Sequence, residues 1–210
     1  MASEIRIRRR TRLPAGERRT QILSAATSII AERGFWGLSL QDVGDACGLT
    51  VNGVLHHMGS KDGLLVAVLD HRDQEDVRAL AGLLDLAVPD AGLTPDDLTR
   101  VAREGQIGLA RMCEAVMARN ASQPEIVRLY SILGAEALSP DHPAHQYFTT
   151  RERVTLEGFA KLASPQANGQ LLARHLLAMM DGLQLQWLRD PTIDLVNVWK
   201  LAAEEISDLS

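Results

Sequence analysis

The chain has 210 residues, 46% of them hydrophobic and 23% charged, which is enough to bury a core in one large or two modest domains. No apolar run reaches the roughly 18 residues of a membrane span, and the basic N-terminus lacks a signal peptide's apolar core. We therefore expect a cytoplasmic protein with no membrane partner. Only two cysteines occur, far apart, so neither a disulfide framework nor a metal or cofactor site is expected.

The net charge of -5 is unevenly divided along the chain. Residues 1–61 contain nine Lys/Arg and five Asp/Glu, whereas residues 62–210 contain thirteen and twenty-two. A basic first segment on an acidic remainder indicates that the first segment alone meets a polyanion. Within it, residues 1–14 are expected to form a flexible basic arm that contacts DNA through Arg8, Arg9 and Arg10. A merely solubilising tail is the alternative.

Apolar spacing and capping residues predict four helices in the first part of the chain, over residues 17–33, 40–47, 51–57 and 61 to about 84. Ser39, Thr50 and Ser60 are suitable N-caps for the last three. The remaining helices are expected over residues 95–119, 124–137, 145–162, 165–189 and 193–209. No segment alternates like a strand, so the sequence predicts an all-α protein of about nine helices.

The second and third helices are separated by a tight glycine turn, which is the pattern of a helix-turn-helix. Two steeply crossing helices need a small residue at their contact, and Gly44 supplies it. Gly48 can adopt the positive φ of the turn. Cys47, here a small apolar residue, together with Leu49 and Val54 would anchor the second helix of the motif.

The third helix of the chain is then the recognition helix, whose first turn faces the bases. Asn52 could pair with adenine and Val51 could touch a thymine methyl group, while Gly53 lets the backbone approach. Asn52 could instead be an ordinary solvated residue at a helix start. Phosphates are expected to pass the far end of this helix, where His57 and Lys61 lie and where the fourth helix begins. The predicted DNA-binding set is Arg8, Arg9, Arg10, Ser39, Thr50, Val51, Asn52, Gly53, His57 and Lys61.

Residues 18–69 resemble the DNA-binding domain of the tetracycline-repressor (TetR) family of bacterial transcription regulators. The stretches that carry the resemblance are "RRTQILSAATSIIAERGFWGLSLQDVGDACGLT" and "VLHHMGSKDGLL". "DGLQLQWL", residues 181–188, is also similar to the penultimate helix of many members. Three positions depart from the family pattern, which usually has tyrosine at Leu55, phenylalanine at Met58 and alanine at Gly44. The missing hydroxyl at Leu55 removes one phosphate contact, worth about 1 kcal/mol.

The resemblance implies an N-terminal three-helix DNA-binding domain, residues 15–62, and a C-terminal helical ligand-binding and dimerisation domain, residues 63–210. It further implies a homodimeric repressor, not an enzyme, that a small molecule releases from a near-palindromic DNA operator. The expected dimer interface is a four-helix bundle containing Leu172, Leu176, Ala178, Met179, Gly182, Leu183, Trp187, Val198 and Trp199. Alternatively, both faces of these helices belong to the core of one subunit.

A ligand pocket is expected among the middle helices. Its candidate residues are Gln106, Met112, Met117, Tyr130, His145, Tyr147 and Phe148, although each could be ordinary core or surface. Two other functions remain open. One is an all-α enzyme or metal-binding protein that uses His142 and His145, although no third ligand lies nearby in sequence. The other is an architectural DNA-binding protein without an effector.

Overall fold

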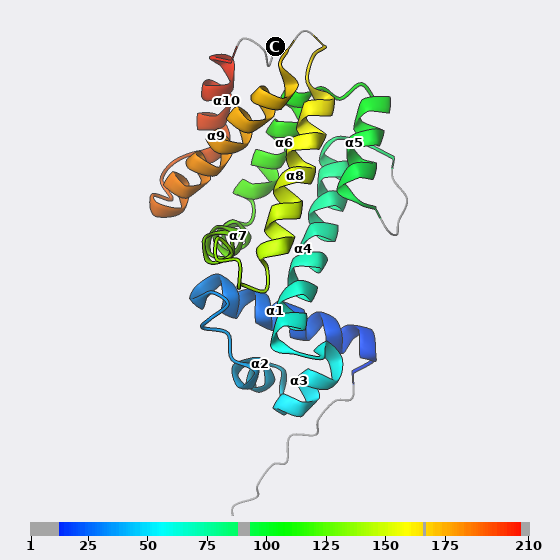
Figure 1. Cartoon of the computed structure of the whole chain (residues 1–210), viewed down its shortest axis with the longest axis vertical. Coiled ribbons are helices and arrows are strands. Elements are labelled where there is room, and N and C mark those ends of the chain that lie inside the picture. Colours follow the sequence, from blue (N-terminus) through cyan, green and yellow to red (C-terminus); the bar gives the residue numbers. More distant parts are fainter. Residues whose placement is uncertain (1–12, 88–92, 166, 207–210) are drawn as a thin grey trace, which may run out of the picture.

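The computed structural model describes residues 13–87, 93–165 and 167–206, and within these ranges every regular element is a helix. The predicted all-α fold is confirmed. Figure 1 shows a small head formed by three helices at one end, a helical body at the other, and one long helix that joins them. The helices are α1 (Ala15–Arg33), α2 (Leu40–Cys47), α3 (Val51–Met58), α4 (Lys61–Leu83), α5 (Pro95–Glu104), α6 (Leu109–Ala121), α7 (Pro124–Glu136), α8 (His145–Leu162), α9 (Gly169–Arg189) and α10 (Leu195–Glu204).

The three short-range caps predicted for the head are present. The Ser39 hydroxyl accepts a hydrogen bond from the Gln41 amide at 3.1 Å, which begins α2. The Thr50 hydroxyl accepts from the Gly53 amide at 3.1 Å, and the Ser60 hydroxyl from the Gly63 amide at 2.8 Å. Because these caps satisfy amides that no helix turn can satisfy, they fix where α2, α3 and α4 begin.

The turn between α2 and α3 requires two glycines for different reasons. Gly48 has φ 65° and ψ 34°, the left-handed conformation that closes α2. Gly44 is needed for space, since a Cβ atom there would lie 2.9 Å from the carbonyl oxygen of Leu49. Gly44 therefore lets the backbone of the turn, at Leu49, approach α2 closely.

The apolar core forms two clusters that do not follow the predicted boundary at residue 62. The first joins the buried side chains of α1 to α4 with Leu129, Leu133, Ala137 and Ala144 from the body. The second fills the body between α4, α5, α6, α8, α9 and α10. Helix α7 thus packs on the head, and α4 contributes to both clusters. Side chains of α7 and α4 are therefore part of the packed core of the head.

One predicted helix is wrong: residues 95–119 are interrupted between α5 and α6. The Ile107 amide donates to the Ala102 carbonyl at 2.8 Å, and Gln106 adopts φ 58° at the position that ends α5. This is the hydrogen-bond pattern that commonly closes a helix around a left-handed residue. The spacing of apolar residues continues unchanged from α5 into α6, so it did not indicate the interruption. The described ranges accordingly contain ten helices.

Three residues expected at the dimer interface lie in the core of the protomer. Leu176 is completely buried, and Leu172 and Trp199 are 5% and 2% exposed. Met179, Leu183 and Trp187 are partly buried against the same core. Ala178 is exposed, while Gly182 and Val198 are partly exposed. The inner stripe of α9 therefore packs within one subunit.

Leu176→Ala should lower the free energy of unfolding by about 2–5 kcal/mol, because it leaves a cavity in a fully packed core. Urea denaturation followed by circular dichroism measures this change. Leu138 is 80% exposed and supplies the matched control, since Leu138→Ala should change stability by no more than about 0.5 kcal/mol. Equal effects of the two substitutions would contradict the position of Leu176 in the core.

Candidate nucleic-acid interface and effector cavity

The outward face of α3 is polar at two positions one turn apart. Asn52 and His56 are exposed, whereas Val54 and Met58 on the opposite face are buried. Val51, Gly53, Leu55 and His57 lie partly exposed at the sides. His56 was absent from the predicted set, although its spacing of four residues from Asn52 on a helix indicates a shared face. Its ring packs against the His57 ring with the centroids 5.4 Å apart.

Several predicted DNA-contact residues also have structural partners. The Ser39 and Thr50 hydroxyls cap helices, and the His57 carbonyl oxygen accepts from Arg19 at 3.1 Å. The Lys61 ammonium lies 4.4 Å from the centroid of the Phe35 ring, which holds it at the start of α4. Arg8, Arg9 and Arg10 lie outside the described residues.

The charge of the head depends on its N-terminal segment. Residues 1–12 contain five arginines and one glutamate, whereas residues 13–61 contain four basic and four acidic residues. Some of these basic groups are paired within the head, such as Arg33 with Asp42 at 3.2 Å. The positive excess of the first 61 residues therefore comes from residues 1–12.

The body contains a cavity of about 1210 Å³ between α4, α5, α6, α7, α8 and α9. Five of the predicted ligand residues line it, namely Met112, Tyr130, His145, Tyr147 and Phe148. The other two do not line it: Gln106 is exposed at the end of α5, and Met117 is completely buried in the body core. The sequence also gave no sign of the charged side chains that α4, α8 and α9 contribute to the wall, among them Asp73, Arg151 and Asp181.

Asp73 on α4 is the centre of one polar cluster in this wall. Its carboxylate accepts hydrogen bonds from the Tyr130 hydroxyl at 3.0 Å, from the Tyr147 hydroxyl at 2.5 Å, and from Arg151 at 3.3 Å. Burial is the main cause that raises the pKa of both tyrosines, so their hydroxyls remain protonated donors. The cluster ties α4 to α7 and α8.

Asp76 lies one turn further along α4 and forms a second cluster. Its carboxylate accepts from Arg119 on α6 at 3.0 Å and from the Gln123 side-chain amide at 3.0 Å. Arg72 lies 3.5 Å from the same oxygen and donates to Gln123 at 2.6 Å. Together the two clusters attach the middle of α4 to three helices of the cavity wall.

A joint between head and body lies where α1 ends. The Glu136 carboxylate of α7 accepts a hydrogen bond from the Phe35 amide at 2.8 Å. His142 is 3% exposed and packs against both the Phe35 and Trp36 rings, with its Nε2 3.8 Å from the Glu136 carboxylate. Burial lowers the pKa of His142, while Glu136 and Asp62 oppose the change. A neutral imidazole therefore fills this joint.

The two histidines of the metal hypothesis have separate roles. His142 Nδ1 accepts from the Ala144 amide at 3.1 Å, whereas His145 Nδ1 lies 2.8 Å from the Ala137 carbonyl oxygen. Across the described residues, no group of three or more His, Cys, Asp or Glu side chains could hold a metal ion. Nothing in this arrangement favours the metal hypothesis.

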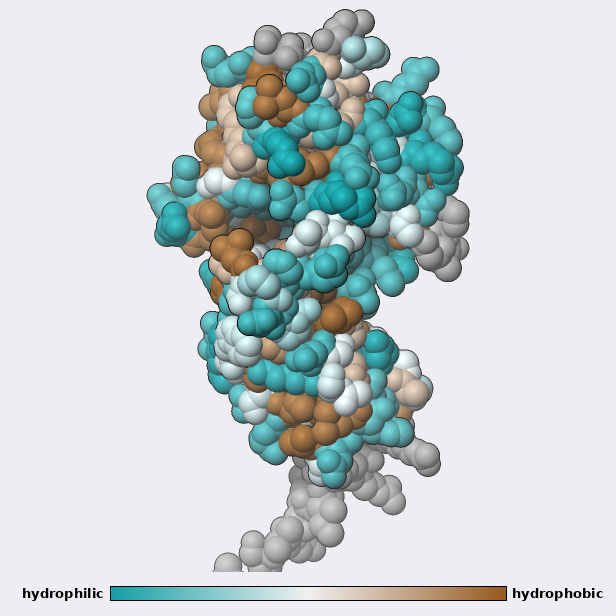
Figure 2. All heavy atoms as spheres, viewed as in Figure 1, coloured by the Kyte–Doolittle hydropathy of each residue, from teal (hydrophilic) through white to brown (hydrophobic). Residues whose placement is uncertain are grey.

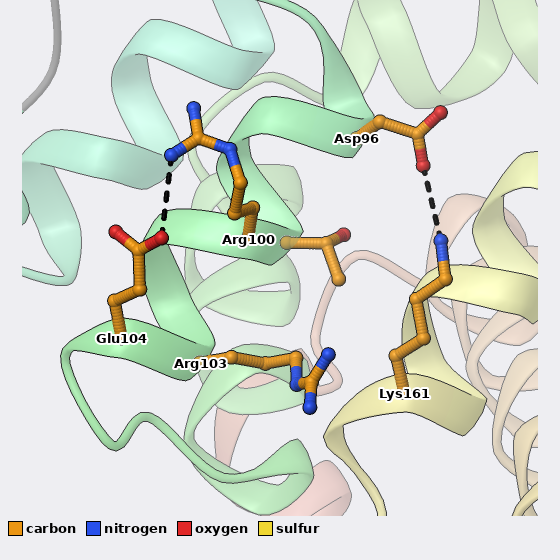
Figure 3. Close-up of a pocket in the computed structure, with 6 residues that line it drawn as sticks. Asp96, Arg100, Arg103, Glu104 and Lys161 are labelled. Carbon is orange, nitrogen blue, oxygen red and sulfur yellow. Dashed lines mark hydrogen bonds and ion pairs between the residues drawn. The ribbon is translucent and has the colours of Figure 1, made fainter.

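A smaller surface hollow of about 440 Å³ lies between α5 and α8 (Figure 3). Arg100 pairs with Glu104 at 3.4 Å, and Lys161 pairs with Asp96 at 3.4 Å. Both pairs are exposed, so solvent screens them and they contribute little to the stability of the fold. The hollow adjoins the larger cavity, because Asp96 and Thr99 line both.

The outward faces of α9 and α10 carry apolar side chains. Leu171, Leu185 and Leu201 are 50%, 40% and 57% exposed, and they were absent from the predicted interface. A Cβ atom built on Gly182 would meet no atom within 4 Å, so the surface around it is open. Figure 2 shows apolar surface over both helices. Separately, none of the helices in the described part of the chain is both long and apolar enough to cross a membrane.

Residues 22–68 match the family model described as bacterial regulatory proteins, tetR family. The chain is 30% identical over 179 residues to the HTH-type transcriptional regulator BetI of Stenotrophomonas maltophilia, covering 82% of this chain and 80% of that protein. In fold it is similar to NalD of Pseudomonas aeruginosa, the secondary repressor of the MexAB-OprM multidrug efflux pump, with a TM-score of 0.65, 21% identity and coverage of 90% and 93%. A TetR transcription regulator from Haloarcula marismortui superposes with a TM-score of 0.68, 15% identity and coverage of 90% and 96%.

Proposed function

The chain belongs to the tetR family of bacterial transcriptional regulators, and we propose that it acts as a homodimeric repressor released from a near-palindromic operator by a small molecule. The observation that carries the proposal is the exposed face of α3. Gly48 closes the helix before it and Thr50 caps its first turn, so the turn between the two helices is well defined. In a dimer, two such helices would enter successive major grooves on one face of DNA.

Base recognition is assigned to Val51, Asn52 and Gly53, with His56 added from its place beside Asn52. Phosphate contacts are assigned to Ser39, Thr50, His57, Lys61 and the three arginines of the arm. Lys61 and His57 lie near opposite ends of the junction between α3 and α4, where the DNA backbone would pass. The arm would add phosphate or minor-groove contacts and a steep salt dependence.

Selection of bound genomic fragments by the purified protein, followed by footprinting, tests the proposal. The expected result is a protected two-fold symmetric site, with half-sites about one helical turn apart or slightly more. Binding without sequence preference would instead support the architectural alternative. Transcription from the selected promoter, measured with and without the protein, then distinguishes a repressor from an activator.

Asn52→Ala should weaken binding to the selected operator by about 5- to 150-fold, because a bidentate base contact contributes about 1–3 kcal/mol of discrimination. Binding to unrelated DNA should change little. Fluorescence anisotropy with operator and scrambled duplexes measures both. Gln74→Ala on the exposed surface of α4 is the matched control and should bind both duplexes like the unchanged protein. If Asn52→Ala kept full preference for the operator, its assignment to base recognition would be wrong.

We place the dimer interface on the outward faces of α9 and α10. Ala178 and Gly182 allow close helix approach, while Leu171, Leu185 and Leu201 supply apolar surface. Val198 and the partly exposed edges of Met179, Leu183 and Trp187 would complete the bundle. Leu172, Leu176 and Trp199 would support this surface from inside the protomer.

The effector is assigned to the cavity bounded by α4, α5, α6, α7, α8 and α9, with Met112, Tyr130, His145, Tyr147 and Phe148 among its contacts. Release requires that the effector bind the DNA-free conformation more tightly than the DNA-bound one. Two routes from cavity to head support the assignment. One is α4, attached to the wall through Asp73 and Asp76, and the other is α7, attached to the head through Glu136.

A further inference from the structure

On one side of the cavity, the positively charged side chain of Arg151 lies among aromatic rings and a carboxylate. The Arg151 guanidinium lies 4.8 Å from the centroid of the Tyr130 ring, and its Nε donates to the Asp73 carboxylate at 3.3 Å. Tyr147 and Phe148 extend the ring cluster, with their centroids 5.3 Å apart. Aromatic faces and carboxylates both attract positive charge, so the protein's own guanidinium marks a cation subsite.

The same cavity presents one carboxylate without a basic partner. Five carboxylates line it, and four of them pair within 4 Å: Asp73 with Arg151, Asp76 with Arg119, Asp96 with Lys161 and Glu152 with Arg174. No basic side chain in the described ranges lies within 4 Å of the fifth, Asp181 on α9. Asp181 stands at the exposed rim, yet desolvation raises the pKa of its carboxyl group, with Arg151 opposing the rise.

The rest of the wall sets the shape of a ligand. Leu80, Met112, Phe159, Leu177 and Met180 present apolar surface, so a bulky hydrocarbon body would be buried there. The Arg151 side chain is 42% exposed and donates one hydrogen bond, so it can swing toward solvent without leaving a buried charge. The three basic side chains of the wall, Arg119, Arg151 and Arg174, already have acidic partners, which disfavours an anionic ligand.

We propose, on the basis of the effector role assigned above, that the cavity binds an organic cation with a bulky apolar body whose charge replaces the Arg151 guanidinium over Tyr130 and beside Asp73. Asp181 attracts the cation at the rim. Once Arg151 is displaced, α8 loses its ion pair with α4, the helix that carries the head. The same event thus recognises the ligand and loosens one attachment of α4.

Isothermal titration calorimetry on the full-length protein tests this with three probes of similar shape. They are tetraphenylphosphonium, the uncharged triphenylphosphine oxide and the anion tetraphenylborate. Tetraphenylphosphonium should bind about 10-fold or more tightly than the uncharged probe, and tetraphenylborate should bind weakest, because charge alone separates the two ions.

Three variants sharpen the test. Asp181→Asn should weaken tetraphenylphosphonium binding about 10-fold, whereas Arg151→Met should strengthen it several-fold by vacating the subsite. Glu157→Gln removes one negative charge from α8 outside the cavity and should leave binding within about 2-fold of the unchanged protein. Sedimentation and circular dichroism verify that each variant keeps its assembly and fold. If Arg151→Met does not fold, Asp181→Asn and the three probes still decide the question.

Two results would overturn the inference: equal binding of the two opposite ions, or weaker tetraphenylphosphonium binding in Arg151→Met. Failure of all three probes to bind would overturn it as well. Operator binding measured without any probe distinguishes a failure of the cation inference from a failure of the proposed function. A protein that binds its operator but prefers the anion remains a regulator with a different ligand class, whereas a protein without an operator contradicts the proposed function itself.

Discussion

Gly182→Arg should produce a folded monomer that binds its operator on the order of 100-fold more weakly. A Cβ atom at this position would meet nothing within 4 Å, so the side chain starts into open space and the fold of the protomer should be kept. In the proposed bundle, however, the arginine would stand where two α9 helices approach each other. Binding two half-sites through one linked dimer typically gains about 100-fold or more over either site alone, and that gain would be lost.

Sedimentation velocity at micromolar concentration measures the assembly, and fluorescence anisotropy measures operator binding. Gly82→Arg is the matched control, since Gly82 also lies within a helix and a Cβ atom there meets nothing within 4 Å, but it is on α4. This variant should remain dimeric. A dimeric Gly182→Arg protein with full affinity would move the interface to another surface.

Gly34→Ala should lower the free energy of unfolding by about 2–5 kcal/mol, because two separate costs coincide. Gly34 has φ 70° and ψ -179°, a conformation that is almost restricted to glycine. A Cβ atom would also lie 2.4 Å from a Glu136 carboxylate oxygen, so the carboxylate must move away from the Phe35 amide. The joint between head and body would then lose its hydrogen bond.

Urea denaturation at a fixed protein concentration measures the loss for Gly34→Ala, and Gly48→Ala is the comparison. Gly48 also has positive φ, but a Cβ atom there meets nothing within 4 Å, so only the conformational cost of about 1–2 kcal/mol applies. Glu136→Gln keeps an oxygen that can accept from Phe35 and should retain most of the stability. An equal loss for the two alanine variants would show that the Glu136 contact contributes nothing.

Local signals in the sequence were reliable where the chain itself imposes the geometry. Ser39, Thr50 and Ser60 cap helices as predicted, because a cap needs only a hydroxyl and a nearby amide on the same short segment. The turn glycines Gly44 and Gly48 were identified for the same reason. The break at Gln106 was missed, since this residue adopts a positive φ that glycine usually supplies.

The candidate sites could be predicted only in part, because they are made by side chains far apart in sequence. Tyr130 and Tyr147 were chosen for their type, but Asp73, which accepts hydrogen bonds from both, lies 57 residues or more earlier on α4. Periodicity identified two faces on α9 but could not say which packs within the protomer. The completely buried Leu176 and the open surface at Gly182 distinguish them.

By itself, the sequence determined the all-α fold, the head with its capped third helix, and the division between a basic N-terminus and an acidic body. These follow from spacing, caps, glycines and charge counts, which are properties of neighbouring residues. The tertiary structure alone decided that α7 packs on the head, that α4 is attached to the cavity wall through two carboxylates, and that Glu136 meets Phe35 across 101 residues. Such contacts depend on how helices pack against one another, and no local pattern encodes them.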